Sequence, residues 1–259
     1  MDESNGFSWA FDLDGVMWTG REPIPGSAET VAALVENGHR VAFVTNNSFA
    51  TVADQEAKLA SFGIAAEGRV ITSAMAGAAL VEPGERVYVL GGPGIVEAVE
   101  ARGGVVVDGA DSDDRPDAVL VGLDRSLSYE RLSRAVLALR SGARFVATNT
   151  DATYPSERGM LPGGGSIVAA VRCATGVEPV VAGKPHDPLA QLVRSILGPD
   201  GIMIGDRPET DGRFALAMGY RFGLVLTGVT SGDDLPIEPQ PAWVGDDVAQ
   251  LVPRILNGS

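Results

Sequence analysis

The hexapeptide Phe11-Asp12-Leu13-Asp14-Gly15-Val16 carries two aspartates at alternate positions, where the strand-like run 9–13 ends. Apolar residues that give way to Asp and Gly are typical of a buried strand that enters a turn. In open α/β sheets, sites form at the carboxyl ends of strands, so both carboxylates can approach one cavity. Close carboxylates raise each other's pKa unless a cation intervenes, which predicts a shared proton or a divalent metal. A plain turn is the alternative, because Asp and Gly are common turn residues.

Strand-like and helix-like segments alternate along almost the whole chain. The strand-like segments are short, rich in Val and Ile, and bounded by Gly, Asp or Asn, and several helical patterns end at glycine. This alternation predicts α/β architecture with mostly parallel strands, and the number of strands favours two sheets. The expected strands are 9–13, 41–45, 70–71, 87–90, 105–107, 118–121, 145–147, 180–182, 202–204, 222–226 and 242–244, and the expected helices are 28–36, 51–62, 129–140, 166–174, 188–197 and 213–218.

No low-complexity linker marks a domain boundary in this chain. The best candidates are Glu82-Pro83-Gly84-Glu85 and the region just before Gly183-Lys184. We therefore expect residues 1–82 and 182–259 to form a discontinuous core domain, into which residues 83–181 are inserted as a second domain.

Composition and charge limit the classes of partner. The chain has 259 residues and a formal net charge of −14, which disfavours nucleic acid and anionic membranes because both reward basic patches. The start, Met1–Asn5, is acidic and polar, unlike a signal peptide, and no apolar run approaches a membrane span of roughly 18 residues. We expect a cytoplasmic protein. The single cysteine, Cys173, excludes an intramolecular disulfide and lies in an apolar helical pattern that predicts burial.

Three further motifs follow predicted strands. Val44-Thr45-Asn46-Asn47 offers a hydroxyl and backbone N–H groups at a helix start, which suits a phosphate, although Thr and Asn are also common helix caps. Ala182-Gly183-Lys184-Pro185 places a lysine where it can neutralise a phosphate, although a solvated surface lysine is the simpler alternative. The stretch 204–212 contains Asp206 and Asp211; Asp206 could join Asp12 and Asp14 at Mg²⁺, and the alternative is an acidic helix start.

Together these motifs resemble the haloacid dehalogenase superfamily. The series Asp-x-Asp, Thr, Lys and Gly-Asp-x-x-x-x-Asp, each at a strand end, covers nearly the whole chain. The forms Phe-Asp-Leu-Asp-Gly, Thr-Asn-Asn, Gly-Lys-Pro and Gly-Asp-Arg-Pro-Glu-Thr-Asp look like subfamily IIA, the nitrophenylphosphatase-like branch. The stretches 114–119 and 155–163 also resemble the glycerol-3-phosphate phosphatases of actinobacteria. This resemblance implies a three-layer, Rossmann-like core with a parallel sheet and a large inserted α/β cap domain.

The resemblance also implies roles for the core residues. Asp12 would be the nucleophile, and Asp14 would protonate the leaving alcohol and then activate water. Mg²⁺ would lie between Asp12, the backbone carbonyl of Asp14, and Asp206. Lys184 and Thr45 would hold the phosphoryl oxygens, and Asp211 would support Lys184 or the metal's waters from behind.

Substrate contacts are expected from two asparagine-containing stretches. Asn46 and Asn47 follow the threonine motif, and Asn46 is expected to act as a backbone donor. The stretch Thr148-Asn149-Thr150-Asp151 resembles the substrate-specificity loop of the subfamily. On this basis Asn149 and Asp151 are expected to face the leaving group, and a simple turn is the alternative.

The expected function is therefore a magnesium-dependent phosphatase that acts on small phosphomonoesters through an aspartyl-phosphate. Glycerol 3-phosphate and phosphoglycolate are among the substrates that subfamily relatives suggest, and dimers formed through the cap are common in such families. A phosphomutase and a non-catalytic, phosphate-sensing binder stay open as alternatives. A dinucleotide-binding enzyme fits poorly, because Leu90-Gly91-Gly92-Pro93-Gly94 is followed by Glu97 where the fingerprint needs glycine.

Overall fold

A computed structural model describes residues 7–109, 115–156 and 158–258. Met1–Asn5, Asp114 and Glu157, which the sequence analysis used, lie outside these residues. The chain forms two compact units, which are described separately below. The core unit consists of Met1–Thr45, Ala53–Ile71 and Lys184–Ser259, and the cap unit consists of Asn46–Val52 and Thr72–Gly183.

The core unit is built on a six-stranded sheet with the order β15-β14-β13-β1-β4-β5. All pairs from β15 to β4 are parallel. Trp9 and Phe11 of β1 and Phe43 of β4 are fully buried, as expected for strands that are covered on both faces. The strands are β1 (Ser8–Phe11), β4 (Arg40–Thr45), β5 (Val70–Thr72), β13 (Ile202–Gly205), β14 (Arg221–Val225) and β15 (Trp243–Gly245).

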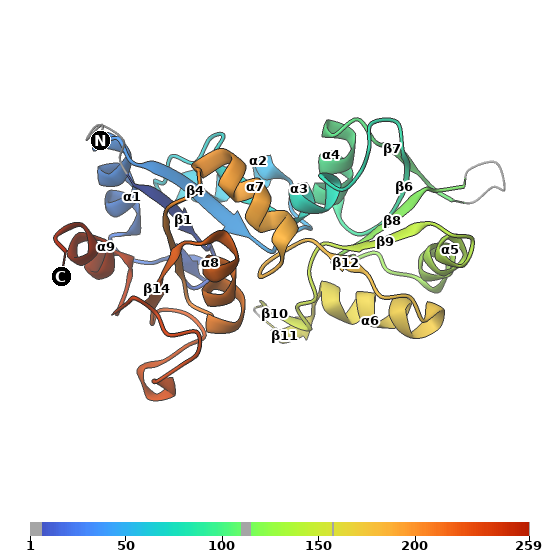
Figure 1. The fold of residues 1–259 in the computed structure, drawn as a ribbon. Helices are drawn as coiled ribbons and strands as arrows, with labels where there is room; N and C mark the ends of the chain where they lie inside the picture. Colours follow the sequence, from blue (N-terminus) through green and yellow to red (C-terminus); the bar gives the residue numbers. More distant parts are fainter. Residues whose placement is uncertain (1–6, 110–114, 157, 259) are drawn as a thin grey trace. The chain divides into compact units, whose positions relative to one another are not determined.

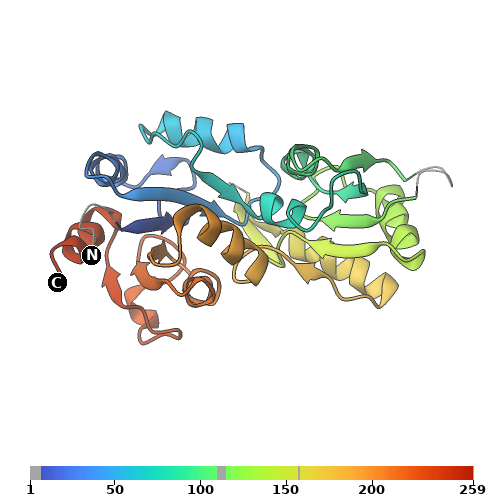
Figure 2. The same ribbon diagram turned by 45° about the horizontal axis from the view of Figure 1, so that its top comes forward.

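Helices cover both faces of this sheet. In Figures 1 and 2, α1 and α2 lie over one face, and α7 and α8 lie over the other. A short antiparallel hairpin of β2 (Trp18–Thr19) and β3 (Glu22–Pro23) follows β1 directly. The helices are α1 (Ser27–Glu36), α2 (Val52–Ser61), α7 (Asp187–Leu197), α8 (Arg213–Met218) and α9 (Val248–Leu256).

The cap unit has its own parallel sheet, with the order β12-β9-β8-β6-β7. One face carries the apolar cluster of Tyr88, Leu90, Val119 and Val121 against α5 and α6. The strands of this sheet are β6 (Arg86–Leu90), β7 (Val105–Val107), β8 (Ala118–Val121), β9 (Arg144–Ala147) and β12 (Val180–Val181). The helices of the cap unit are α3 (Ser73–Ala78), α4 (Pro93–Ala101), α5 (Tyr129–Arg140) and α6 (Gly164–Thr175). A separate hairpin is formed by β10 (Thr153–Ser156) and β11 (Gly159–Pro162).

The predicted α/β class with two largely parallel sheets is confirmed. The unit boundaries fall at 71/72 and 183/184, whereas the sequence suggested 82/83 and 181/182; that the two parts are independent domains stays a prediction. The expected burial of Cys173 is wrong. Helix α6 buries Ile167, Val168 and Val171 on its inner face, and Cys173 lies on the outer face. No helix among the described residues is both long and apolar enough to cross a membrane.

The glycines that follow β6 accommodate the segment 46–52, which packs within the cap unit. The Gly94 N–H donates to the carbonyl of Phe49 at 3.0 Å. A Cβ on Gly94 would lie 2.2 Å from the carbonyl oxygen of Ala50, and one on Gly92 would lie 2.4 Å from the Phe49 ring. The Glu97 carboxylate accepts a hydrogen bond from the Val52 N–H at 3.1 Å. These glycines therefore serve close packing of the chain on itself.

This packing predicts opposite effects of two Gly→Ala substitutions in the cap unit. Gly94→Ala should destabilise the fold by about 1–3 kcal/mol, because its Cβ meets a backbone oxygen that cannot withdraw alone. Gly77→Ala, in helix α3, is the matched control: the nearest atom to its Cβ is 3.6 Å away, and alanine favours the helix by up to about 1 kcal/mol. Thermal unfolding measures both, and equal melting temperatures for the two variants would contradict the assignment.

Candidate active site

Three polar side chains reach the same edge of the core sheet. Phe11 of β1 is in register with Ile204 of β13 and with Phe43 of β4. Asp12, Thr45 and Asp206 each lie within two residues of this register position, at the carboxyl ends of their strands. Since the strands are parallel, their ends meet, and the site forms where such sheets generally bind ligands.

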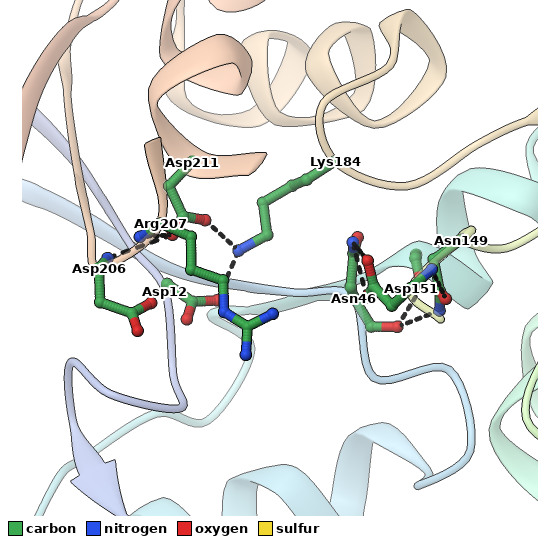
Figure 3. Close-up of polar contacts among 9 residues, drawn as sticks. Asp12, Asn46, Asn149, Asp151, Lys184, Asp206, Arg207 and Asp211 are labelled. Atoms are coloured by element: carbon green, nitrogen blue, oxygen red, sulfur yellow. Dashed lines mark hydrogen bonds and ion pairs between the residues drawn. The ribbon is translucent and has the colours of Figure 1, made fainter. Parts of the chain in front are cut away.

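Lys184 binds two of the site's carboxylates. Its Nζ lies 2.5 Å from Oδ1 of Asp12 and 2.7 Å from Oδ1 of Asp211, as Figure 3 shows. The side chain of Lys184 is 3% exposed, that of Asp12 is 13% exposed and that of Asp211 is 1% exposed. The paired carboxylates raise the pKa of Lys184 against the opposing effect of burial, so the lysine stays charged. Buried charges require such pairing, because an isolated one costs several kcal/mol.

Asp211 is oriented by the one-turn π-helix η1 (Pro208–Gly212), which follows β13. This turn brings its Oδ2 back to accept the N–H groups of Asp206 at 3.2 Å and Arg207 at 3.1 Å. Its other oxygen binds Lys184. Both oxygens of Asp211 are therefore used to hold the loop and the lysine.

Asp206 is fixed by a loop that the sequence reasoning missed. Its Oδ2 accepts the Val229 N–H at 2.7 Å, and its backbone carbonyl accepts the Thr230 hydroxyl at 2.6 Å. This loop follows β14, just as the four motifs follow their strands. Its position after a strand of the same sheet could have indicated from the sequence that it belongs to the site. Gly228 permits the approach, since a Cβ there would lie 2.0 Å from Oδ2 of Asp206.

The remaining oxygen of Asp206 indicates a cation. Oδ1 is buried and has no hydrogen-bond partner among the described residues. Carboxylate oxygens of Asp12, Asp206 and Asp211 all lie within 4.8 Å of one another. Because Asp211 is already engaged, Asp12 and Asp206 are the groups that fit a divalent ion.

The pKa values of both carboxyls agree with this reading. Burial, and next the neighbouring Asp211, raise the pKa of Asp206 to about 6, while the Val229 N–H and Arg207 lower it less. Burial also raises the pKa of Asp12 well above its ordinary value; Lys184 opposes this rise, and the other two carboxylates add to it. Acids held this way favour a positive charge nearby, which a divalent cation supplies.

Asp14 differs from the other acids because it is exposed. Its Oδ1 accepts a hydrogen bond from the Trp18 indole N–H at 2.7 Å. Gly15 follows with a φ of +85°, and a Cβ there would lie 2.6 Å from Oδ2 of Asp206. The glycine thus allows the turn to pass close to Asp206 while the Asp14 side chain remains at the surface.

Asn46, Asn149 and Asp151, three of the residues expected to contact the substrate, lie in the cap unit and bind one another. Asn46 Nδ2 donates to Oδ2 of Asp151 at 3.2 Å, and Asn149 Nδ2 donates to the Asn46 carbonyl at 2.8 Å (Figure 3). The Asp151 N–H donates to Oδ1 of Asn149 at 3.1 Å. Gly165 lets the N-terminus of α6 pack on this stretch, since a Cβ there would lie 2.2 Å from the Thr150 carbonyl oxygen.

Asn47 has a local role in the same unit. Its Oδ1 accepts hydrogen bonds from the N–H groups of Phe49 at 3.0 Å and Ala50 at 3.3 Å. This geometry is that of an Asx turn, which shapes the backbone after the threonine motif.

Comparison with known proteins identifies the family. A model described as haloacid dehalogenase-like hydrolase matches residues 9–104, and a related hydrolase model of this superfamily matches residues 181–251. The 5'-nucleotidase YutF of Bacillus subtilis is 38% identical over an alignment of 255 positions, which covers 95% of this chain and 98% of that protein. This chain belongs to the haloacid dehalogenase-like hydrolase family.

Solved structures of this hydrolase family support the predicted subfamily as well. The 4-nitrophenylphosphatase of Thermotoga maritima is 33% identical, with a TM-score of 0.86 over 95% of each chain. The glycerol phosphate phosphatase of Mycobacterium tuberculosis, in complex with magnesium, is 38% identical with a TM-score of 0.85, covering 94% of this chain and 75% of that one. The resemblance to subfamily IIA and the Rossmann-like α/β fold are confirmed.

The environment of Asp206 predicts that stabilisation by Mg²⁺ depends on pH. The folded-state pKa of about 6 lies above the ordinary 3.8, so this group's contribution to stability is present below pH 3.8 and is lost as pH rises through 6. Mg²⁺ binds the carboxylate that forms. Mg²⁺ should therefore raise the melting temperature more at about pH 7.5 than at about pH 5. At a hundred times its Kd the ion stabilises the fold by up to about 2.7 kcal/mol.

The matched variants are Asp206→Asn and Asp233→Asn, the second being an exposed acid in a surface turn. Calorimetry with and without Mg²⁺ should show that the first loses the metal-dependent shift and the second keeps it. A full shift in Asp206→Asn would contradict this assignment of the ligand.

Proposed function

We propose that this protein is a magnesium-dependent phosphatase that hydrolyses small phosphomonoesters through an aspartyl-phosphate on Asp12. The observation that carries the proposal is the setting of the Asp12 carboxylate. Lys184 binds its Oδ1, and Oδ2 accepts no hydrogen bond among the described residues. One oxygen is thus anchored while the other is available to attack phosphorus.

In the first step, Oδ2 of Asp12 forms a bond to phosphorus as the ester P–O bond breaks. The oxygen of Asp14 that Trp18 does not bind gives its proton to the leaving alcohol. Lys184 and the Thr45 hydroxyl hold phosphoryl oxygens while negative charge moves among them. Splitting the reaction at a covalent intermediate replaces one difficult displacement by two easier ones.

In the second step, the Asp14 carboxylate takes a proton from a water molecule, which attacks the phosphorus of the aspartyl-phosphate. The bond to Asp12 breaks and inorganic phosphate leaves. The exposure of Asp14 suits this exchange with alcohol and water. A group that first gives and then takes one proton returns the enzyme to its starting state.

Asp12, the backbone carbonyl of Asp14 and Asp206 would hold the Mg²⁺ ion. When bound, the ion screens the repulsion between the anionic nucleophile and the anionic phosphate. Asp211 keeps Lys184 and the Asp206 loop in place from behind. Each acidic residue of the site therefore has a separate task.

Names of relatives support small phosphorylated metabolites as substrates, with glycerol 3-phosphate and phosphoglycolate as the first to assay. Among the relatives are a 5'-nucleotidase and a glycerol phosphate phosphatase. We further propose that the enzyme acts in the cytoplasm, in keeping with its single cysteine and strong acidity. A homodimer stays a prediction.

The reaction class is tested with p-nitrophenyl phosphate. Turnover should require Mg²⁺ and fall by roughly a thousandfold or more in Asp12→Asn, because the nucleophile is gone. The control variant Asp233→Asn should retain wild-type activity, since that side chain is on the surface. A folded, metal-bound wild type that turns over no phosphate ester would leave a phosphate-sensing binder as the function. Transfer of the phosphoryl group to a second sugar hydroxyl, without release of phosphate, would establish a phosphomutase.

The roles of Asn46, Asn47, Asn149 and Asp151 as substrate contacts are proposals as well. If Asp151 faces the leaving group, Asp151→Ala should change the ratio of kcat/KM between glycerol 3-phosphate and p-nitrophenyl phosphate by roughly threefold or more. Glu130→Gln, on the exposed side of α5, is the control and should leave the ratio unchanged. An unchanged ratio in both variants would assign Asp151 a structural role, of which its contact with Asn46 is a part.

A further inference from the structure

The tight turn after β1 returns Trp18 to the side of Asp14. The N–H of Met17 donates to the Leu13 carbonyl at 2.8 Å, and the N–H of Gly15 donates to the Trp18 carbonyl at 2.7 Å. A backbone bridge then sets Asp14 beside Trp18. This geometry aims the indole N–H at Oδ1 of Asp14, 2.7 Å away.

Trp18 itself is held firmly within the core unit. It is 1% exposed, whereas the carboxylate that it binds is exposed. The ammonium of Lys58, from α2, lies 3.8 Å from the centre of its ring, and Phe62 of the same helical region packs at 5.8 Å. A buried ring with these neighbours has little freedom, so the direction of its N–H is fixed.

The contact with the Trp18 ring is the close contact of the Lys58 ammonium that the described residues show. Burial lowers the pKa of its ammonium, and the charge of Asp14 opposes this effect. A partly desolvated cation over the face of an indole is attracted by the ring's electron density. The lysine thereby holds the indole beside Asp14.

We propose that Trp18 is a positioning residue for the general acid–base: its N–H fixes Oδ1 of Asp14 so that Oδ2 alone exchanges the proton with the leaving group and water. This inference rests on the proposed phosphatase function. It adds to that function a residue outside the four motifs that the sequence identified.

The chemistry of the indole suits this task. Indole N–H is a donor only, so it cannot take the proton that Asp14 must pass on. A hydrogen bond to a carboxylate is stronger than a neutral one, and here the donor is shielded from water. Without it, an exposed aspartate side chain rotates freely, and the oxygen that carries the proton is less often near the ester oxygen.

A purely structural role makes a different prediction from a positioning role. If Trp18 only packs the hairpin, its loss weakens reaction of all esters alike. If it positions Asp14, its loss matters most where the leaving group needs a proton. Alkoxides are poor leaving groups and require protonation, whereas p-nitrophenolate leaves without it.

The test is Trp18→Phe, which keeps an aromatic face for Lys58 and Phe62 but removes the N–H. The kcat/KM for glycerol 3-phosphate, or for the best alkyl phosphate of a panel, should fall by roughly 10- to 100-fold. The kcat/KM for p-nitrophenyl phosphate should change by less than about threefold, since it reports only steps up to loss of the phenol. For p-nitrophenyl phosphate, kcat and KM should fall together in this variant, because hydrolysis of the aspartyl-phosphate still needs Asp14 and becomes the slow step.

The matched control is Trp243→Phe in β15, whose ring lies under Arg221 at 4.7 Å in a similar cation–π contact. It should leave both kcat/KM values unchanged. Equal losses for both esters in Trp18→Phe, or no loss for either, would overturn the proposal. Failure of the proposed function is distinct from both, since the wild type would then hydrolyse neither ester.

A second variant covers the case in which Trp18→Phe does not fold. Incorporation of 3-benzothienylalanine at position 18 preserves the shape of the indole and replaces its N–H by sulfur. The same selective loss for alkyl phosphates is expected. Wild-type values for both esters in this variant would refute the positioning role directly.

Discussion

The buried ammonium of Lys184 is the constraint on which the site depends. It lies between Asp12 and Asp211, at 2.5 and 2.7 Å, in a region that also holds Asp206. Three carboxylates at such close range repel one another, and one lysine compensates only part of their charge. The structure relieves the rest with backbone N–H groups aimed at Asp206 and Asp211, and with a place for a divalent cation. Strand order, the π-helical turn and the loop after β14 all serve this balance.

The sequence predicted the parts of the site that follow from strand ends. Asp12, Thr45 and Asp206 were recognisable because each follows an apolar run, and parallel strands bring such positions together. Lys184 follows the two-residue strand β12, and its sequence motif alone would have been a weak indication of a site. The position of this motif in the series of four made the lysine recognisable. The same logic, applied to β14, would have pointed to Val229, whose backbone N–H donates to Asp206, and to Thr230, whose hydroxyl does so.

Other features depend on packing that no local pattern encodes. Trp18 lies outside the four motifs, and its contact with Asp14 requires a particular turn and hairpin. Cys173 lies in an apolar stretch, yet the rotation of α6 is set by Ile167 and Val171, which place the cysteine outside. Gly92 and Gly94 belong to an incomplete dinucleotide-binding fingerprint, and what they admit is the chain segment 46–52, which stands far earlier in the sequence.

That segment has a consequence for how such enzymes can be recombined. The heptapeptide 46–52 packs against Gly92 and Gly94 and is tied to Glu97, so it belongs with the cap unit although it is separated from it in sequence. A chimera that exchanges residues 72–183 alone would combine a foreign cap with a native heptapeptide shaped for other neighbours. The cap unit is therefore encoded by two pieces of sequence, and an exchange of this unit between relatives has to carry both.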